Sequence, residues 1–366
     1  MPLREARLHR IGAAAPDDVS GLAAGIAAGE IQPDRIIAIF GKTEGNGLVN
    51  DFSRGFAVRA LADLLARHLG PEAAAQICLV MSGGTEGGLS PHFLVFEVRD
   101  ASGEADPAAL AIGRARTPDL PPEALGRLAQ VDQVAAGVAA AMRDAGIDGP
   151  AAVHFVQVKC PLLTAARVQE AARRGAATAT RDTLKSMSLS RAAASLGIAT
   201  ALEEIDRPAL RDAAIGADWS LHSARASASA GIELAGHEIV VLGRGRGWTG
   251  PLRIDHAVMQ DALDIESVRA ALARLDLASP GQLPPPLRDR LVTLLAKAEA
   301  ASDARLRGFR HTMLDDSDLA ATRHARAFVA GALASLVGHA QIYVSGGAEH
   351  QGPDGGGPVA IIARAT

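Results

Sequence analysis

One ordered set of residues occurs three times along this chain of 366 residues: a Lys, then an Arg, then a Ser followed by Gly or Ala. The three sets are Lys42, Arg54 and Ser82; Lys159, Arg191 and Ser229; and Lys297, Arg323 and Ser345. The serine segments read SGGTE, SAGIE and SGGAE. Three ordered copies predict three similar units, each of which places an amine, a guanidinium and a hydroxyl around one centre.

The register of the middle set depends on a glutamate. No apolar strand is expected before Ser229, and two other serines, Ser223 and Ser227, lie close by. We assign Ser229 because Glu233 then matches Glu86 and Glu349, which follow the serines of the other two sets at the same spacing.

The repeat divides the chain into three units, residues 1–104, 110–248 and 252–366. Stretches rich in Pro, Gly and charge lie near the two boundaries. Within the units, amphipathic helical patterns alternate with short apolar runs that are typical of strands. We therefore expect an α/β protein of three structurally similar repeating units in a pseudo-threefold arrangement, with strands meeting inside and helices outside. Each arginine is expected to open a helix, and each serine to lie between a helix and a closing strand.

Bulk properties exclude several classes of function. The net charge of −4 gives no electrostatic footprint for nucleic acid or for an anionic membrane. Two cysteines fit a reducing compartment without a disulfide framework, and the N-terminal segment lacks the apolar core of a signal peptide. No run of about 20 apolar residues predicts a membrane span. We expect a cytoplasmic protein.

Serine and lysine together indicate nucleophilic catalysis. A serine hydroxyl attacks a carbonyl only when a nearby base removes its proton, and a lysine can do so once burial or neighbouring cations lower its pKa. Lys42 and Lys159 end apolar strands, where open α/β units present functional groups. The glycines after Ser82 and Ser345 would let backbone N–H groups approach a substrate oxygen, although they could also merely serve a turn. The sequence GKT at 41–43 is no phosphate loop, because it lacks the Gly five residues earlier.

A glycine-rich tract at residues 345–357 contains carboxylate and amide side chains. Backbone carbonyls with one carboxylate can hold Mg²⁺ or Ca²⁺. A cation in this tract is therefore one interpretation of its composition.

The segments that carry these residues resemble the cyanuric acid hydrolase and barbiturase family of cyclic amidohydrolases. The most specific stretches are GKTEGNGLVNDFSR, MSGGTEGGLSPH, HFVQVKCPLLT, SASAGIEL, RGFRHTMLDDSDLAATRHARA and YVSGGAEHQGPDGGGP, and the match runs almost end to end. The resemblance implies three repeating units around a central β-barrel-like core with outer helices, assembled as a homotetramer. It implies hydrolytic opening of the cyanuric acid ring to carboxybiuret, which loses CO₂ to give biuret.

Roles for individual residues follow from the resemblance, motif by motif. Lys159 would be the catalytic base and Ser229 the nucleophile. The arginines Arg54, Arg191 and Arg323 would bind the ring carbonyls. The rest of the substrate shell would be Ser82, Gly83, Ala230, Ser345 and Gly346, supported by Lys42 and Lys297. A structural Mg²⁺ or Ca²⁺ would be held by Glu299, Ala348, Gln351, Gly352, Pro353 and Gly356. No organic cofactor is implied, and the cation would hold the last loop in place rather than take part in the chemistry.

Three alternatives remain open from the sequence. The same motifs fit a barbiturase, which acts on a ring with CH₂ in place of one N–H. A non-catalytic binding protein on the same scaffold would be favoured by a degraded Ser/Lys set, and all three sets are present. A metal-dependent amidohydrolase would lose activity with chelators. Which of the three serines attacks is not decided by the residues alone.

Overall fold

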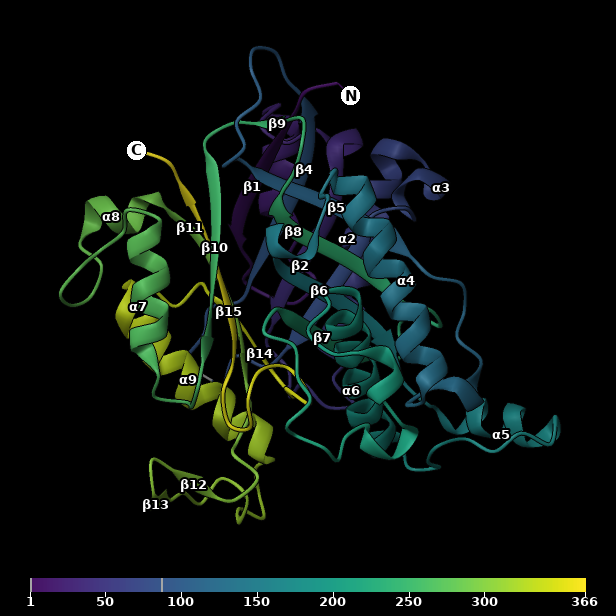
Figure 1. The fold of residues 1–366 in the computed structure, drawn as a ribbon. Helices are drawn as coiled ribbons and strands as arrows, with labels where there is room; N and C mark the ends of the chain where they lie inside the picture. Colours follow the sequence, from purple (N-terminus) through teal and green to yellow (C-terminus); the bar gives the residue numbers. More distant parts are fainter. Residues whose placement is uncertain (1, 87) are drawn as a thin grey trace.

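Three four-stranded arrangements form the centre of the protein, and a computed structural model describes them over residues 2–86 and 88–366 (Figure 1). The first contains β1 (Arg4–Gly12), β2 (Ile36–Thr43), β3 (Cys78–Gly83) and β4 (His92–Asp100). The second contains β5 (Leu110–Arg116), β6 (Val153–Pro161), β7 (Ala226–Gly231) and β8 (Glu238–Arg244). The third contains β10 (Leu252–Met259), β11 (Leu291–Ala298), β14 (Tyr343–Gly346) and β15 (Gly357–Arg364).

All three arrangements have the same strand order. The orders are β1-β4-β2-β3, β5-β8-β6-β7 and β10-β15-β11-β14. In each, the last strand pairs antiparallel with the first and second strands, while the second and third strands run parallel. A short strand, β9 (Trp248–Thr249), extends the first sheet beside β1, and β12 (Arg305–Leu306) and β13 (Phe309–Arg310) form a separate hairpin.

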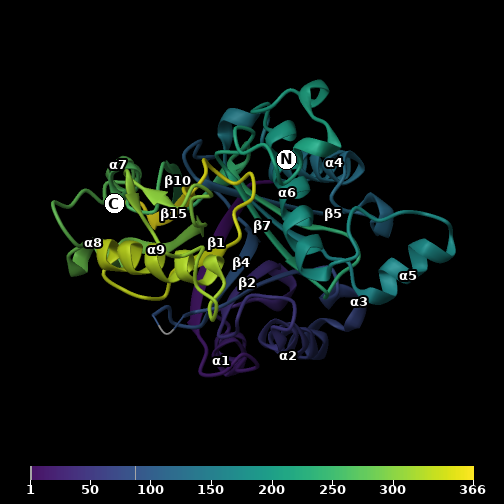
Figure 2. The ribbon, with the colours of Figure 1, turned by 90° about the horizontal axis from the view of Figure 1, so that it is seen from below.

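The central barrel implied by the family resemblance is not found in the described part of the chain. The strands belong to separate sheets, and among the described strands no ladder pairs one sheet with the next. A barrel needs a closed circle of paired strands, whereas each sheet ends at an edge strand, β3, β7 or β14. The sheets meet instead through side chains, in one core that includes Phe40, Phe155 and Leu295. Seen from below, the first, middle and last thirds of the chain lie around a shared centre (Figure 2).

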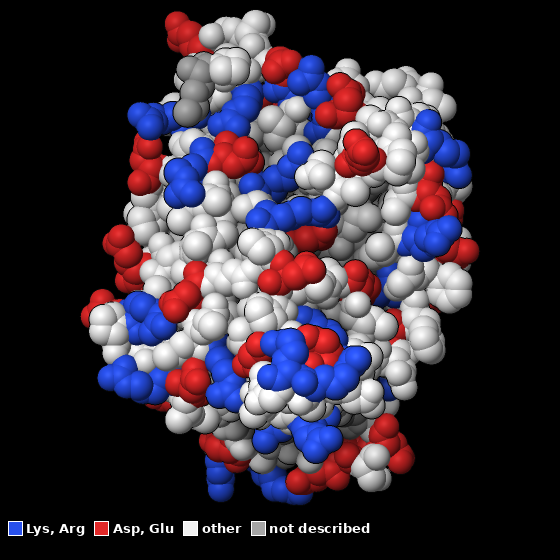
Figure 3. Space-filling model, turned by 90° about the vertical axis from the view of Figure 1, so that its right-hand side faces the viewer, with Lys and Arg blue, Asp and Glu red and all other residues white. Residues whose placement is uncertain are grey.

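Helices cover the outer sides of the sheets (Figure 1). They are α1 (Ser20–Ala27), α2 (Phe52–Leu69), α3 (Pro71–Ala74), α4 (Leu128–Ala145), α5 (Ala165–Arg173), α6 (Thr183–Ala201), α7 (Ile265–Arg274), α8 (Pro285–Arg290) and α9 (Ala321–Val337). Among the described residues, no helix combines the length and the apolar character that crossing a membrane requires. Basic and acidic side chains are interspersed on the face in Figure 3, as the small net charge predicts.

Local signals explain which helices begin where the sequence predicted. α2 begins after Asp51, whose carboxylate accepts a hydrogen bond from Ser53 N, and it ends at Gly70 with a φ of 79°. α6 begins earlier than expected, because Asp182 caps it by accepting from Lys185 N. Arg191 therefore lies in the middle of α6, and the expectation that it opens a helix was wrong.

Candidate active site

Each sheet places a lysine directly beside a serine. The parallel pairing of the second and third strands aligns Lys42 with Ser82, Lys159 with Ser229 and Lys297 with Ser345. As expected, each serine lies in chain order between a helix and the closing strand of its sheet. All three are on strands, β3, β7 and β14, and the strand that carries Ser229 was not predicted. This register results from ordinary backbone pairing, so three distant parts of the chain present the same two groups at the ends of their strands.

The lysines are buried, at 1% exposure each, but their contacts differ. Lys42 Nζ donates to Ser82 Oγ at 3.3 Å, and Lys297 Nζ donates to Ser345 Oγ at 3.2 Å. Lys159 Nζ donates instead to the backbone oxygen of Met81 at 2.9 Å. The middle amine thus lies beside its serine in the strand register but is directed toward the neighbouring sheet.

The three serines converge on one small cavity. Ser229 Oγ lies 3.4 Å from Ser345 Oγ, across two sheets. The cavity is lined by Gly47, Arg54, Met81, Ser82, Gly83, Met187, Arg191, Ser229, Ala230, Arg326, Ser345 and Gly346. Every substrate-shell residue expected from the sequence lines this cavity except Arg323.

Arg326 lines the cavity in the place expected for Arg323. Both arginines lie on α9, three residues apart, so they share one side of the helix. Arg326 is only 2% exposed, whereas the side chain of Arg323 is 30% exposed, with Nε 3.7 Å from Glu86 Oε1. The sequence motif contains both residues, and only the depth of burial distinguishes them.

Each cavity arginine pairs with the glutamate of another set. Arg191 Nε donates to Glu349 Oε2 at 2.7 Å, and its Nη2 donates to the second carboxylate oxygen at 2.5 Å. Arg326 and Glu86 form the same two-point contact, with Nε to Oε2 at 2.6 Å. Each pair joins a helix of one third of the chain to the serine segment of another, so the pairs hold the guanidiniums at the cavity.

The third pair, Arg54 with Glu233, is looser. Arg54 Nε lies 3.5 Å from Glu233 Oε1, while Nη1 donates to Ala230 O at 3.3 Å and Nη2 to Leu48 O at 2.7 Å. Glu233 Oε1 also lies 3.6 Å from Lys159 Nζ. The middle set therefore differs from the others, because its glutamate is shared between an arginine and a lysine.

Glycines in the serine segments make room for these ion pairs. A Cβ on Gly347 would lie 2.6 Å from Arg191 Cζ, and one on Gly84 would lie 2.1 Å from Arg326 Nη2. A Cβ on Gly231 would lie 1.7 Å from Glu233 Oε2. The second residue after each serine must therefore be small, a requirement that the sequence analysis did not identify, since it considered only the glycine directly after Ser82 and Ser345.

Burial makes the amines weakly basic. It lowers the pKa of Lys297 to about 7, assisted by Arg191, and holds the pKa of Lys42 well below its usual range, assisted by Arg326. The pKa of Lys159 is also lowered by burial, while Glu233 opposes this shift and Arg54 supports it. Amines in such surroundings can be neutral near neutral pH, which a general base requires.

The residues expected to hold a cation surround one end of β11. Glu299 Oε1 accepts from Ala300 N at 3.0 Å, and Oε2 accepts from Ala348 N at 3.3 Å. Burial, together with the nearby carboxylate of Glu349, raises the pKa of Glu299 to about 7. Two carboxylates close together away from water are costly unless a proton or a cation offsets their charge.

The loop after Ala348 is tightly packed against this carboxylate. Gln351 Oε1 accepts from Ala228 N at 2.7 Å, which joins the loop to β7. Gly352 has a φ of 83°, and Pro353 follows it. A Cβ on Gly356 would lie 2.0 Å from Met259 O. The expected ligand residues therefore lie in one constrained loop.

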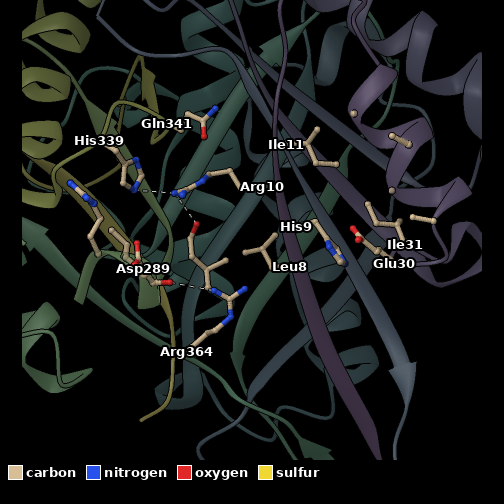
Figure 4. A pocket seen from close by; sticks show the side chains of 17 residues that line it. Leu8, His9, Arg10, Ile11, Glu30, Ile31, Asp289, His339, Gln341 and Arg364 are labelled. Carbon is tan, nitrogen blue, oxygen red and sulfur yellow. Dashed lines mark hydrogen bonds between the residues drawn. The ribbon is translucent and has the colours of Figure 1, made fainter. Parts of the chain in front are cut away.

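Two other features lie apart from this centre. A cavity of about 750 Å³ lies between β1, α1 and the third sheet, where Arg10 contacts His339 (Figure 4). It contains none of the expected site residues. The sequence analysis did not identify the cluster of His154, Asp255 and His256, whose potential ligand atoms lie within 4.8 Å of one another. Asp255 Oδ2 already accepts a hydrogen bond from Arg274 Nε at 2.7 Å.

The matching family and two similar proteins of known sequence are described as amidohydrolases. Residues 7–364 match the family described as amidohydrolase ring-opening protein. A cyanuric acid amidohydrolase of Azorhizobium caulinodans is 64% identical, covering 100% of this chain and 99% of the relative. One from Pseudomonas sp. (strain ADP) is 50% identical, over 98% and 99%.

Solved structures agree over the whole length. The crystal structure of the cyanuric acid hydrolase from A. caulinodans has a TM-score of 0.93 at 64% identity and covers 100% of both chains. A second cyanuric acid hydrolase, described as an evolutionary innovation by structural concatenation, has a TM-score of 0.94 at 49% identity, covering 99% of this chain and 100% of that one. The mixed α/β fold is therefore that of these structures.

Proposed function

The chain belongs to the family of ring-opening amidohydrolases, and from this premise we propose that it opens the ring of cyanuric acid by Ser–Lys catalysis. One observation carries the choice of substrate: three serines from separate sheets and three arginines from separate helices line a single cavity, and each serine is paired in register with a lysine. Cyanuric acid is a flat ring with threefold symmetry, so each set can address one carbonyl and one ring nitrogen.

The proposed reaction begins at Ser229. Neutral Lys159 takes the proton of the hydroxyl, and Oγ attacks a ring carbonyl carbon. Nζ must first leave Met81 O and turn toward the serine beside it in the strand register. The developing oxyanion is stabilised by guanidinium and backbone N–H donors at the cavity. Lys159 then protonates the departing ring nitrogen, and water hydrolyses the acyl-enzyme to release carboxybiuret, which decarboxylates to biuret.

The choice of Ser229 rests on the family motif and on Glu233. Ser82 and Ser345 each accept a hydrogen bond from a lysine. The middle lysine instead has a carboxylate within 3.6 Å, which can stabilise the ammonium that forms when Lys159 takes the proton. The other two sets would bind and orient the remaining carbonyls, with Lys42 and Lys297 supporting their serines.

Substrate preference is tested by comparing two rings. We expect the purified protein to hydrolyse cyanuric acid with a kcat/KM well above that for barbituric acid, because CH₂ in place of one N–H removes a hydrogen-bond donor at one of the three subsites. Steady-state rates and product identification for both rings measure this. Preference for barbituric acid would make the protein a barbiturase.

The proposal includes a structural cation and an assembly. Glu299 and the backbone carbonyls of the loop from Ala348 to Gly356 are hard oxygen ligands that suit Mg²⁺ or Ca²⁺. Arg191 is already bound to Glu349, and a cation would offset the charge of the second buried carboxylate, Glu299. A cation there would fix the loop that carries Glu349 and thereby Arg191. The common strand order supports repeat units at residues 1–104, 110–248 and 252–366 in a pseudo-threefold arrangement. The homotetramer and the cytoplasmic location are inferred from the family resemblance.

Removal of the cation is expected to lower the thermal stability of the protein more than its rate of hydrolysis. Treatment with EDTA should lower the Tm, because a ligand at 100 times its Kd stabilises the folded state by about 2.7 kcal/mol. Added Ca²⁺ or Mg²⁺ should restore the Tm of the wild type but not of Glu299→Gln. Calorimetry and rates on the same samples measure both effects. A Tm that EDTA leaves unchanged would contradict the cation site.

A further inference from the structure

We propose that Glu233 is the residue through which the buried amine of Lys159 exchanges its proton with solvent. This inference rests on the proposed role of Lys159 as the general base. It adds a positioning and proton-relay residue that no motif assigned, since sequence reasoning used Glu233 only to set the register of the middle serine.

The first step of the argument is the isolation of Lys159. Its side chain is 1% exposed, and Nζ donates to Met81 O, a carbonyl that cannot carry a proton away. Within the described residues, Glu233 is the carboxylate within ion-pair distance of this amine. Because the amine must be neutral before it can take the serine proton, a proton has to leave this enclosed position.

The second step is the position of Glu233 between two cavities. Its carboxylate contacts Lys159 on the side of the active site but is not among the groups that line that cavity. It lines a separate cavity of about 470 Å³, together with Leu79, Arg116 and Glu238. The glutamate thus separates the buried amine from a space that is large enough for water.

The third step is its freedom to move. Both oxygens of Glu86 and of Glu349 are held by an arginine. In contrast, Glu233 Oε2 and Arg54 Nε are both buried and have no hydrogen-bond partner among the described residues. Buried polar atoms are normally paired, and exceptions often mark groups with a catalytic role. The middle glutamate can therefore rotate between Lys159 and the side cavity.

The proton transfer balances without any further reagent. An Nζ–H bond of the Lys159 ammonium breaks and an O–H bond forms on Glu233, which leaves a neutral amine and a neutral carboxyl group. The carboxyl group then releases the proton to a water molecule in the side cavity and returns to carboxylate. Hydrolysis of an amide to a carboxylate and an N–H releases one proton near neutral pH, so the route serves each turnover.

Chemical rescue tests the route. Glu233→Ala is expected to lower kcat about 100-fold, within the range for loss of a proton-transfer group. Sodium formate should partly restore the rate with saturation, because it supplies a carboxylate that can enter the side cavity. Glu233→Gln keeps the shape, cannot carry the proton and leaves no space, so its rate should fall without rescue. Glu86→Gln serves as the matched control, and formate should not raise its rate.

The pH profile gives a second readout that a purely structural role would not move. The charged groups around Lys159 are Arg54 from α2, Glu238 from β8 and Glu233 itself, with the thiol of Cys160 next in the chain. Since the Glu233 carboxylate raises the pKa of Lys159, the acidic limb of kcat/KM should move to lower pH in Glu233→Gln.

The outcomes separate the two proposals. Two results would contradict the relay while Lys159→Ala is inactive, and both leave the proposed function standing. In the first, Glu233→Ala keeps the wild-type kcat. In the second, formate does not restore the rate of Glu233→Ala and the acidic limb of the Glu233→Gln profile stays in place. If Lys159→Ala keeps its activity, the general base is elsewhere and the proposed function itself fails. Circular dichroism of each variant identifies misfolding, and Glu233→Gln preserves the test when Glu233→Ala does not fold.

Discussion

Replacement of Ser229 by alanine is expected to lower kcat on cyanuric acid by on the order of 10⁴-fold or more, and Lys159→Ala should have a similar effect. Ser229 lies in the shared cavity beside Lys159 in the strand register, and without the hydroxyl no acyl-enzyme can form. The double variant should be no worse than either single one, because the two residues act as a unit. Steady-state rates and mass spectrometry of trapped acyl-enzyme measure these effects.

The serines of the other two sets are the matched controls. Ser82→Ala and Ser345→Ala remove a hydroxyl of the same chemistry and comparable burial from the same cavity. We expect kcat/KM to fall about 10- to 100-fold, because each substitution removes one or two hydrogen bonds to the substrate. A loss of about 1.4 kcal/mol of binding free energy corresponds to a factor of ten. A loss of 10⁴-fold in either variant, with a mild effect at Ser229, would move the attack to that serine.

This control matters because distances alone rank the serines differently. Lys42 and Lys297 lie within hydrogen-bond distance of Ser82 and Ser345, whereas Lys159 is directed to Met81 O. In a structure without substrate, catalytic hydrogen bonds are often not yet formed. The middle set is distinguished by the carboxylate of Glu233, which forms an ion pair with Lys159 and, in the relay proposed above, accepts its proton.

Much of the secondary structure was predictable because the strands that end at the cavity are apolar runs. β2, β3, β6, β8, β14 and β15 lie where the hydrophobic pattern placed them. The first strand of each sheet was not predicted, and neither were β7 and β11, which carry Ser229 and Lys297. β1 carries charged residues along its length, with only Ala6 and Leu8 buried. A strand of this kind pairs because of its neighbours, and its sequence pattern does not reveal it.

The part of the candidate site that consists of residues in sequence motifs was predictable. Within each sheet, two parallel strands pair so that the lysine and the serine of one set become cross-strand partners. The ion pairs between Arg191 and Glu349 and between Arg326 and Glu86 were not predicted. They join residues 158 and 240 positions apart, and such contacts depend on how the sheets pack rather than on any local pattern.

The third arginine provides the other large expected effect. Arg326→Gln should lower the free energy of unfolding by about 3–5 kcal/mol, because it leaves the buried carboxylate of Glu86 without its partner. It should also raise KM for cyanuric acid, since the guanidinium lines the cavity. Urea unfolding and steady-state kinetics measure the two effects separately.

Arg323→Gln is the control, because the same substitution is made three residues away on the same helix. This side chain is 30% exposed and reaches Glu86 only at 3.7 Å, so a change within about 0.5 kcal/mol and a nearly unchanged KM are expected. Arg326→Lys should lie between the two, because it keeps the charge but loses the two-point contact. A larger rise in KM for Arg323→Gln than for Arg326→Gln would indicate that Arg323, not Arg326, binds the ring carbonyl. The comparison therefore decides whether depth of burial or position in the motif assigns the third guanidinium.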